Sequence, residues 1–289
     1  MKSNQKKQRW AVVGLGRAGQ ARIKSLRNHP MASLIHVSSR REPSGASFAD
    51  VLASDVDAVA LCRESAHHAA DALACIQAGK HVLVEYPLAT NVSDARMVLA
   101  EAEGFGRVVH VGFLGLRSAW SQRVADVVGS SHIKRVTYSF TAGFGQVPRA
   151  EAEKERWGVL ILARLHQLIH WFGPLTLVSS QIEELTGGWI VNVDLQTEDR
   201  QLIRLMETRC TGLARTRSVR AWRVDQQEIP TPEWKPERGV FAHDTDICIQ
   251  RIAGHTGTQA HVNAASIIEG LSLAEAIARC AVAVQPGAM

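Results

Sequence analysis

Cysteine is scarce in this chain, and no two cysteines stand in a pattern that suggests a shared site. The five residues are dispersed, odd in number and without a C-x-x-C pair: Cys62, Cys75, Cys210, Cys248 and Cys280. Disulfide frameworks and structural zinc sites both need paired, regularly spaced cysteines. The sequence therefore indicates neither, and we expect a cytoplasmic protein without a bound metal.

Long apolar runs are missing as well. After the basic segment Met1 to Arg9, the run Trp10–Val13 is interrupted by Gly14 and Gly16, so it is too short for a signal peptide or a spanning helix. The net charge of +5 suits acidic small molecules or nucleotides but falls short of a nucleic-acid surface. With 289 residues, 46% of them hydrophobic, we expect a soluble protein of two domains that binds neither membrane nor nucleic acid.

The first part of the chain alternates strand-like and helix-like runs. The predicted strands are Trp10–Val13, Leu34–Val37, Asp57–Leu61, His81–Val84 and Arg107–Val111. The predicted helices are Gln20–Arg27, Ala69–Ala78 and Ser93–Glu103. This rhythm indicates a parallel, doubly wound sheet whose ligand lies beyond the carboxyl ends of the strands. We therefore predict an α/β Rossmann domain over residues 1–112.

A G-x-G-x-x-G motif follows the first predicted strand and precedes the first predicted helix. It reads Gly14, Leu15, Gly16, Arg17, Ala18, Gly19. In a dinucleotide site the first glycine allows a tight turn, the second lets the pyrophosphate approach, and the third lets the helix pack on the strand. The alternative is a glycine-rich turn in a flavodoxin-like domain without this cofactor.

The acid expected at the end of the second strand is absent. NAD-binding domains place an Asp or Glu there for the ribose 2′-hydroxyl, whereas this chain has Ser39, Arg40 and Arg41. A guanidinium donates a bidentate pair to a 2′-phosphate. The sequence therefore favours NADPH, with NADH as a weaker cofactor, even if one of the two arginines faces solvent.

Further candidates follow the third and fourth strands. Cys62, Glu64 and His67 come after one strand, and Glu85 and Tyr86 come after the next. Their position at the carboxyl ends of the sheet predicts a place at the cofactor. For Glu64, a solvated loop acid is the alternative.

The second part of the chain, residues 113–289, predicts an α+β domain with a large, mostly antiparallel sheet. One helix is expected near Trp157–Phe172, and two more over Phe241–Ala253 and Ser266–Val284. The predicted strands are Lys134–Thr141, Leu175–Glu184, Trp189–Gln196, Gln201–Glu207 and Ala214–Arg223. Such a sheet serves either as the wall of a substrate cleft or as the surface of a homo-oligomer.

Five segments taken together are typical of one family: Gln77 to Pro87, Gly14 to Gly19, Val37 to Glu42, Phe140 to Gly143 and Ala163 to Leu165. Through them the sequence resembles the biliverdin reductases of the mammalian type, over nearly its whole length. The resemblance implies reduction of biliverdin, or a related linear tetrapyrrole, to bilirubin with NADPH. It also implies that Tyr86 orients the substrate or relays a proton, that Glu85 lies at the nicotinamide ribose, and that Arg164 faces the tetrapyrrole.

The wider superfamily includes glucose-fructose oxidoreductase and inositol dehydrogenase, and its members usually have a lysine and a histidine that this chain lacks. Tyr86 stands for the lysine and Ala163 for the histidine. Oxidation of an alcohol needs a base, and a tyrosine with its ordinary pKa of about 10 is a poor base at neutral pH. Reduction of a conjugated acceptor relies more on orientation and electrostatics.

One departure from the reductases falls after the fifth strand, where Gly115 stands for an acid of the family. Either that acid is dispensable or the substrate is another imine or conjugated compound, and a nucleotide-binding sensor without turnover is a third reading. Arg164 has a simpler alternative as well, pairing with a carboxylate on the helix surface.

Two other clusters have less specific readings. His166 and His170 have a spacing that suits a metal, but no third ligand is evident and a packed or surface pair is favoured. A basic cluster is either a solvated sheet face or a steering surface for bilin propionates. Its members are Arg209, Arg215, Arg217, Arg220 and Arg223.

Overall fold

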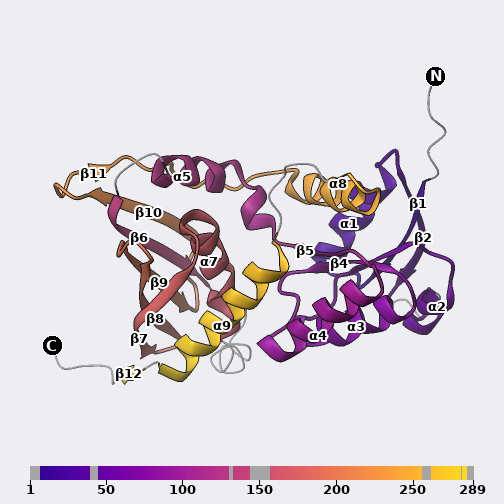
Figure 1. Ribbon diagram of the computed structural model, residues 1–289, viewed down its shortest axis with the longest axis horizontal. Coiled ribbons are helices and arrows are strands. Elements are labelled where there is room, and N and C mark those ends of the chain that lie inside the picture. Colours follow the sequence, from indigo (N-terminus) through magenta and orange to yellow (C-terminus); the bar gives the residue numbers. More distant parts are fainter. Residues whose placement is uncertain are drawn as a thin grey trace. The chain divides into compact units, whose positions relative to one another are not determined.

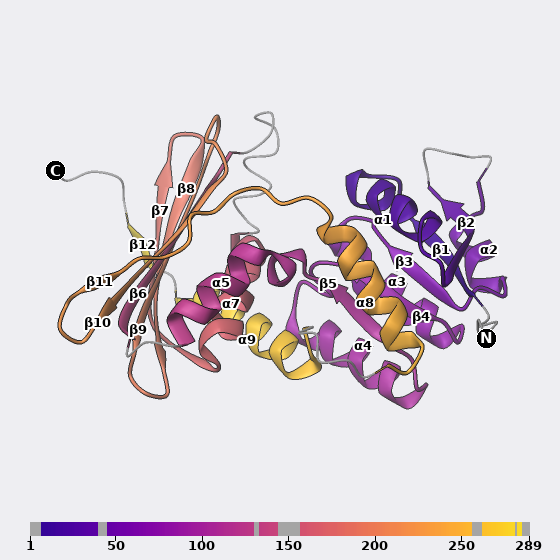
Figure 2. The ribbon, with the colours of Figure 1, turned by 90° about the horizontal axis from the view of Figure 1, so that it is seen from above.

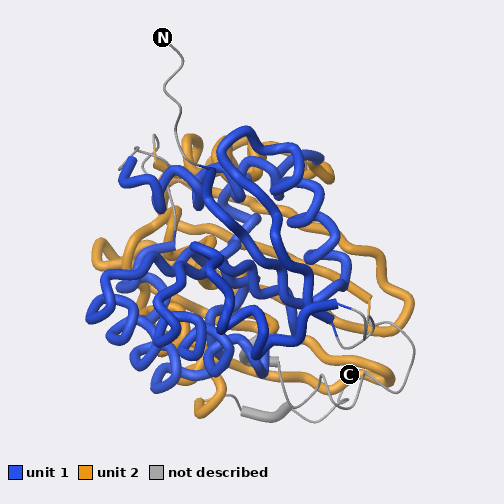
Figure 3. The backbone as a smooth tube through the Cα atoms, turned by 90° about the vertical axis from the view of Figure 1, so that its right-hand side faces the viewer, with its two compact units in different colours: residues 1–117, 238–268 blue, residues 118–237, 269–289 orange. Residues whose placement is uncertain are grey.

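The computed structural model describes residues 7–39, 45–129, 133–143, 157–255, 262–280 and 282–284. They form two compact units, residues 1–117 with 238–268 and residues 118–237 with 269–289 (Figure 3). The division predicted from sequence, 1–112 and 113–289, gives two continuous domains, whereas the first unit also includes the later segment 238–268. The reason is helix α8 (Val240–Ile252), which packs against helix α1 (Arg17–Arg27).

The first unit contains a parallel sheet of five strands in the order β2-β1-β3-β4-β5. Short apolar runs with Val and Ala build the inner strands, and β3 is buried along its whole length. The strands are β1 (Gln8–Val13), β2 (Ala32–Ser38), β3 (Ala58–Leu61), β4 (His81–Glu85) and β5 (Val109–Gly112). The predicted doubly wound α/β fold is confirmed.

Helices cover both faces of this sheet. Figure 1 shows α1 and α8 on one face, and α3 (Ser65–Gln77) and α4 (Val92–Gly104) on the other. Cys248 and Ile249 of α8 are fully buried in one cluster with Trp10 and Leu26. The short helix α2 (Phe48–Ala53) follows β2, and the 3-10 turn η1 (Leu114–Arg117) follows β5.

The second unit contains a mixed, mostly antiparallel sheet in the order β11-β10-β6-β9-β8-β7-β12. Neighbouring strands are antiparallel except for the pairs β6 with β9 and β7 with β12. The strands are β6 (Ile133–Ala142), β7 (Leu175–Leu185), β8 (Gly188–Thr197), β9 (Leu202–Cys210), β10 (Thr216–Arg223), β11 (Glu228–Ile229) and β12 (Val282–Val284). The predicted α+β class is confirmed.

Of the described helices, α5 (Ala119–Gly129), α7 (Trp157–Phe172) and α9 (Ala264–Cys280) lie on one face of the second sheet (Figure 2). Trp120, Tyr138 and Trp171 pack there with ring centroids 5.5 to 6.1 Å apart. Along β8, buried and half-buried residues alternate, as expected of a sheet covered on one face. No helix among the described residues is both long and apolar enough to cross a lipid bilayer.

Two expectations for the helices of the second unit need correction. The helix predicted over Ser266–Val284 ends at Cys280, because Val282–Val284 pairs in parallel with Gln181, Ile182 and Glu183 of β7. Helix α5 was not predicted from its sequence. It buries Trp120, Val124 and Val128, which share one helical face at spacings of four residues.

Candidate functional site

The glycine motif forms a tight turn between β1 and α1. Gly14 has a φ of 103°, and a Cβ there would lie 2.5 Å from the carbonyl oxygen of Cys62. A Cβ on Gly19 would lie 1.9 Å from the carbonyl oxygen of Gly14, so this glycine allows α1 to pack closely on the turn. Gly16 differs, because nothing lies within 4 Å of its Cβ position. Its missing side chain leaves open space for a ligand.

A cavity of about 760 Å³ adjoins this turn. The predicted cofactor residues that line it are Gly14, Leu15, Gly16, Ser39, Cys62, Glu64 and His67. Arg17, Ala18 and Gly19 lie in the first turn of α1. Arg40 and Arg41, predicted to bind the 2′-phosphate, fall outside the described residues.

The shape and polarity of this site fit a dinucleotide. Helix α1 has no acidic residue in its first turn and no side-chain cap at Gly16, so its first N–H groups are available to a phosphate. From the end of β2 to the start of α2 the described lining contains Ser38, Ser39 and Ser47 and no acid, and the acid Glu64 lines the cavity after β3. At this end of the cavity the described polar side chains are therefore hydrogen-bond donors, and none is a carboxylate that would repel a 2′-phosphate.

Glu85 ends β4 and lies against α1. Its Oε1 atom is 2.7 Å from Nε of Arg22, whose side chain is fully buried. Burial raises the pKa of Glu85, and the neighbouring Arg22 guanidinium acts in the opposite direction. The sequence did not single out Arg22. The available signal was a charged residue on the same helical face as the buried Gly19 and Leu26.

Tyr86 follows Glu85 and precedes a cis peptide bond to Pro87. Its ring packs against that of Phe113, with the centroids 4.6 Å apart. Phe113 lies just beyond β5, so the two rings come from neighbouring strand ends. The sequence did not indicate this contact either, because nothing in the segment after β5 points to Tyr86.

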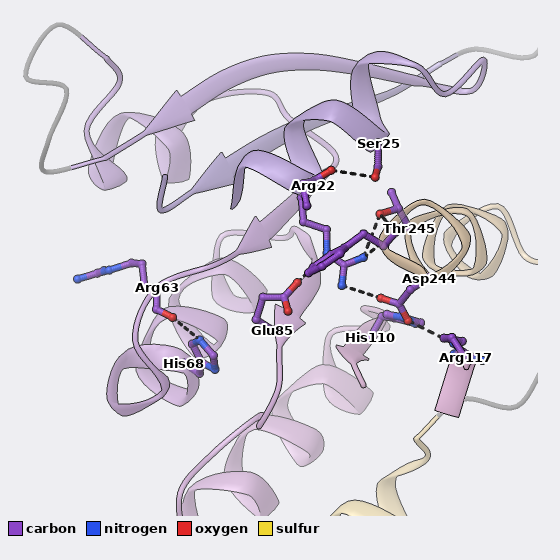
Figure 4. A network of polar contacts seen from close by, with 11 residues as sticks. Arg22, Ser25, Arg63, His68, Glu85, His110, Arg117, Asp244 and Thr245 are labelled. Carbon is purple, nitrogen blue, oxygen red and sulfur yellow. Dashed lines mark hydrogen bonds and ion pairs between the residues drawn. The ribbon is translucent and has the colours of Figure 1, made fainter. Parts of the chain in front are cut away.

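His68 connects the loops after β3 and β4 (Figure 4). Its Nδ1 lies 2.7 Å from the carbonyl oxygen of Pro87, and its Nε2 lies 2.9 Å from that of Arg63. Arg63 in turn donates to both carboxylate oxygens of Asp71 at 2.9 and 3.0 Å. The peptide after Tyr86 and the cavity wall at Arg63 are thus held by one buried side chain.

Arg164 belongs to the second unit, unlike Glu85 and Tyr86. It is buried on α7, where its Nε and Nη2 donate to Glu207 of β9 at 2.7 Å each. Its guanidinium also lies 4.2 Å from the centroid of the Phe140 ring. Arg164 therefore has a carboxylate partner, as the alternative interpretation from sequence expects, but this partner is the buried Glu207 and not a residue on the helix surface.

The predicted basic cluster divides in two. Arg209, Arg215 and Arg217 lie within 5.8 Å of the Phe140 ring, together with Arg164. Arg220 instead pairs with Glu228 and lies near the ring of Trp222. Arg223 is exposed at the end of β10.

The two histidines of α7 differ in their surroundings. His166 is buried against Gly270, whereas His170 is exposed. Within the part of the chain that the structure describes, no three His, Cys, Asp or Glu side chains gather as a metal site.

Comparisons with known proteins agree with this architecture. The model of an oxidoreductase family with an NAD-binding Rossmann fold matches residues 8–113. Human biliverdin reductase A is 32% identical over 260 residues, which cover 84% of this chain and 85% of the human protein. The mouse protein is 30% identical over 263 residues, covering 86% of this chain and 87% of its own length.

Solved structures show the same fold at lower identity. The biliverdin reductase of Synechocystis sp. PCC 6803, in complex with biliverdin and NADP+, superposes with a TM-score of 0.78 at 20% identity, covering 94% of this chain and 98% of its own. A putative myo-inositol dehydrogenase from Sinorhizobium meliloti 1021 gives 0.79 at 16% identity, covering 95% and 97%. The chain therefore belongs to the glucose-fructose oxidoreductase and inositol dehydrogenase family, and it is an NAD(P)-dependent oxidoreductase homologous to biliverdin reductase A.

Proposed function

We propose that this protein reduces biliverdin to bilirubin with NADPH, by hydride transfer to the central methine bridge of the tetrapyrrole. The similarity to two biliverdin reductases over more than four fifths of the chain supports this substrate. The structural observation that carries the proposal is the arginine group around Phe140. A bilin carries two propionate carboxylates, and an arginine-rich surface suits them.

The arginine group around Phe140 has an excess of positive charge. Arg164 and Arg209 share the buried carboxylate of Glu207, whereas the Nε atom of Arg217 is buried without a hydrogen-bond partner. Burial lowers the pKa of Arg217, and the positive charges of Arg164 and Arg209 act in the same direction. An anionic substrate would relieve this repulsion. We therefore place a propionate on Arg217, and assign Arg164 to the tetrapyrrole.

In the first unit, the nicotinamide supplies the hydride when the cofactor is bound. We propose that the Gly14 to Gly19 turn and the first turn of α1 hold the pyrophosphate, and that Ser39, Arg40 and Arg41 hold the 2′-phosphate. Leu15, Cys62, Glu64 and His67 would line the remaining cofactor surface. Glu85 would bind the nicotinamide ribose, and Tyr86 would orient the acceptor or relay a proton to a pyrrole nitrogen.

The second candidate keeps the fold and the cofactor but changes the acceptor to another imine or conjugated compound. The observation in its favour is in the segment that follows β5 and includes η1. There Gly115 stands where the related reductases have an acid, and the neighbouring Phe113 places a ring on Tyr86. A site that offers the Tyr86 and Phe113 rings and lacks that acid would suit a substrate that needs no carboxylate partner.

One spectrophotometric experiment separates these functions. Biliverdin and NADPH are mixed with the protein, and the red absorption band of biliverdin is followed together with the blue-region band of bilirubin. Bleaching of the first with growth of the second is the expected result. Absence of any change with NADPH and with NADH, in a protein that binds either cofactor, would reject biliverdin as the substrate. Turnover of other conjugated acceptors would then favour the second candidate, and binding without any turnover would indicate a sensor.

A further inference from the structure

Arg22 lies at the centre of a polar network inside the first unit (Figure 4). Its side chain is fully buried, and each of its three nitrogens contacts a different group. Nε pairs with Glu85 at 2.7 Å, Nη2 pairs with Asp244 at 2.7 Å, and Nη1 donates to the hydroxyl of Thr245 at 3.0 Å. The guanidinium therefore bridges the end of β4 to helix α8, which follows it by more than 150 residues in sequence.

Asp244 is the second fully buried member of this network. Its Oδ2 contacts Arg22, and its Oδ1 lies 3.0 Å from Nε2 of His110 and 3.3 Å from Nε of Arg117. The carboxylate thus has partners on α1, β5 and η1. Its position is set from three sides.

The protonation of His110 follows from its two contacts. Arg251 is always a donor, and its Nη1 lies 3.1 Å from Nδ1 of His110, so this nitrogen accepts. The ring proton is then on Nε2, from which it is donated to Asp244. Burial lowers the pKa of His110, in agreement with a neutral ring.

Gly112 leaves the space in which Arg22 meets Glu85. It pairs with Glu85 between β5 and β4. A Cβ at this position would lie 2.5 Å from Nη2 of Arg22 and 3.4 Å from Oε1 of Glu85. The sequence thus provides both the charges of the network and the room for them.

We propose that Asp244 is a positioning residue of the cofactor site: it holds the Arg22 guanidinium in the orientation that aims the Glu85 carboxylate at the nicotinamide ribose. The inference rests on the proposed function, which assigns Glu85 to that ribose. Without Asp244, Arg22 keeps one carboxylate partner and gains freedom to turn, so the direction of Glu85 is no longer fixed. Asp244 itself acts through Arg22 and is not assigned a contact with cofactor or substrate.

The test compares two ligands that share the adenosine half. NADPH carries the nicotinamide ribose, whereas adenosine 2′,5′-bisphosphate lacks it, and both are titrated by isothermal calorimetry. Asp244→Asn is expected to weaken NADPH binding at least about tenfold, because one hydrogen bond to a charged group contributes that much or more. Affinity for the bisphosphate should stay within about twofold. NADH and AMP serve as the equivalent pair if the protein prefers NADH.

The matched control is Asp246→Asn on the same helix. Asp246 is 42% exposed in its side chain and pairs with His29 rather than with Arg22. This variant should bind both ligands as the unaltered protein does. Thermal melting of each variant verifies that the fold is retained.

Double-mutant cycles show whether Asp244 acts through Arg22 and Glu85. In an Arg22→Met background, and separately in a Glu85→Gln background, adding Asp244→Asn should change NADPH affinity by less than about twofold. The second background keeps the test usable if Arg22→Met does not fold, because Glu85→Gln removes a charge without leaving two buried carboxylates unpaired.

Three results would overturn the proposal. The first is NADPH affinity that Asp244→Asn leaves unchanged, the second is equal weakening of both ligands, and the third is additive losses in both cycles. None of these measurements uses biliverdin. Failure of the proposed biliverdin reduction would therefore appear in the spectrophotometric assay and not here.

Discussion

The ring of Tyr86 packs against that of Phe113 with the centroids 4.6 Å apart and the planes inclined by 31°. The two residues follow β4 and β5, which are neighbours in the parallel sheet. Phe113 is buried, whereas Tyr86 is half-buried. The contact therefore fixes the ring of Tyr86 at the carboxyl edge of the sheet through packing, independently of its hydroxyl group.

Tyr86→Phe separates these two contributions. The variant keeps the ring contact with Phe113, so we expect NADPH affinity to stay within about twofold and kcat for biliverdin to fall less than about tenfold. Loss of a positioned proton donor would lower kcat by more than that, by about a hundredfold or more. Stopped-flow absorbance gives kcat, and cofactor fluorescence gives the affinity. A loss of a hundredfold or more in kcat with cofactor binding intact would instead assign the hydroxyl to proton transfer. Tyr86→Ala is the comparison that removes the ring as well.

The double variant Arg40→Ala with Arg41→Ala addresses cofactor choice. A bidentate guanidinium contact with a phosphate contributes about 1.5 to 3 kcal/mol, so NADPH binding should weaken at least about tenfold while NADH binding stays nearly constant. Calorimetric titration with both cofactors gives the comparison. Equal weakening of the two would contradict the assignment of these arginines to the 2′-phosphate.

Arg164→Met tests the arginine group around Phe140. The change removes a guanidinium that pairs through two nitrogens with the fully buried Glu207, and breaking a buried pair costs about 3 to 5 kcal/mol. We expect a lower melting temperature, a higher KM for biliverdin and unchanged NADPH affinity. Arg220→Met is the matched control, because the Arg220 and Glu228 side chains are 60% and 43% exposed and such pairs contribute little. A KM for biliverdin that Arg164→Met does not change would remove Arg164 from the substrate site.

The fold was predictable because its signals are local. Strands of Val and Ala, a glycine turn and helical runs occur in the order that a doubly wound sheet requires, and the alternation along β8 indicates a sheet covered on one face. The return of α8 to the first unit was not predictable. The sequence of this segment predicts a helix, but it contains no signal that the helix packs against Trp10 and Leu26.

The residues of the candidate site divide in the same way. Gly14, Gly16 and Gly19 belong to one motif whose spacing implies their geometry, and the structure places them at one turn beside the cavity. Arg22, Glu85 and Asp244 are separated by 63 residues or more, and only the folded chain shows that one guanidinium contacts both carboxylates. Glu207 was missed for the same reason, since its partner Arg164 lies on another element.

Gly112→Ala is expected to disturb the pair between Arg22 and Glu85. The added methyl would lie 2.5 Å from Nη2 of a side chain that is fully buried and held by several partners, so the neighbours have little room to shift. Overpacking of this kind costs about 1 to 3 kcal/mol, and NADPH affinity should fall with it. Gly104→Ala, where nothing lies within 4 Å of the new methyl, is the control and should not destabilise the protein. Chemical denaturation measures both, and equal stability of the two variants would contradict the tight packing at Gly112.

The acid stability of the protein should depend on Asp244. Burial opposes ionisation of this carboxyl, but the hydrogen bond from His110 and the charges of Arg22 and Arg117 outweigh it and lower its pKa well below the ordinary 3.8. A lowered pKa stabilises the folded state above pH 3.8, and that contribution is lost as the pH falls below this value. Asp244→Asn removes the titrating group, so its melting temperature should be lower than that of the unaltered protein at neutral pH and should fall less steeply in acid. Asp246→Asn should follow the unaltered protein throughout. Parallel curves for all three proteins, recorded by circular dichroism from neutral pH to about pH 3, would show that Asp244 does not carry this dependence.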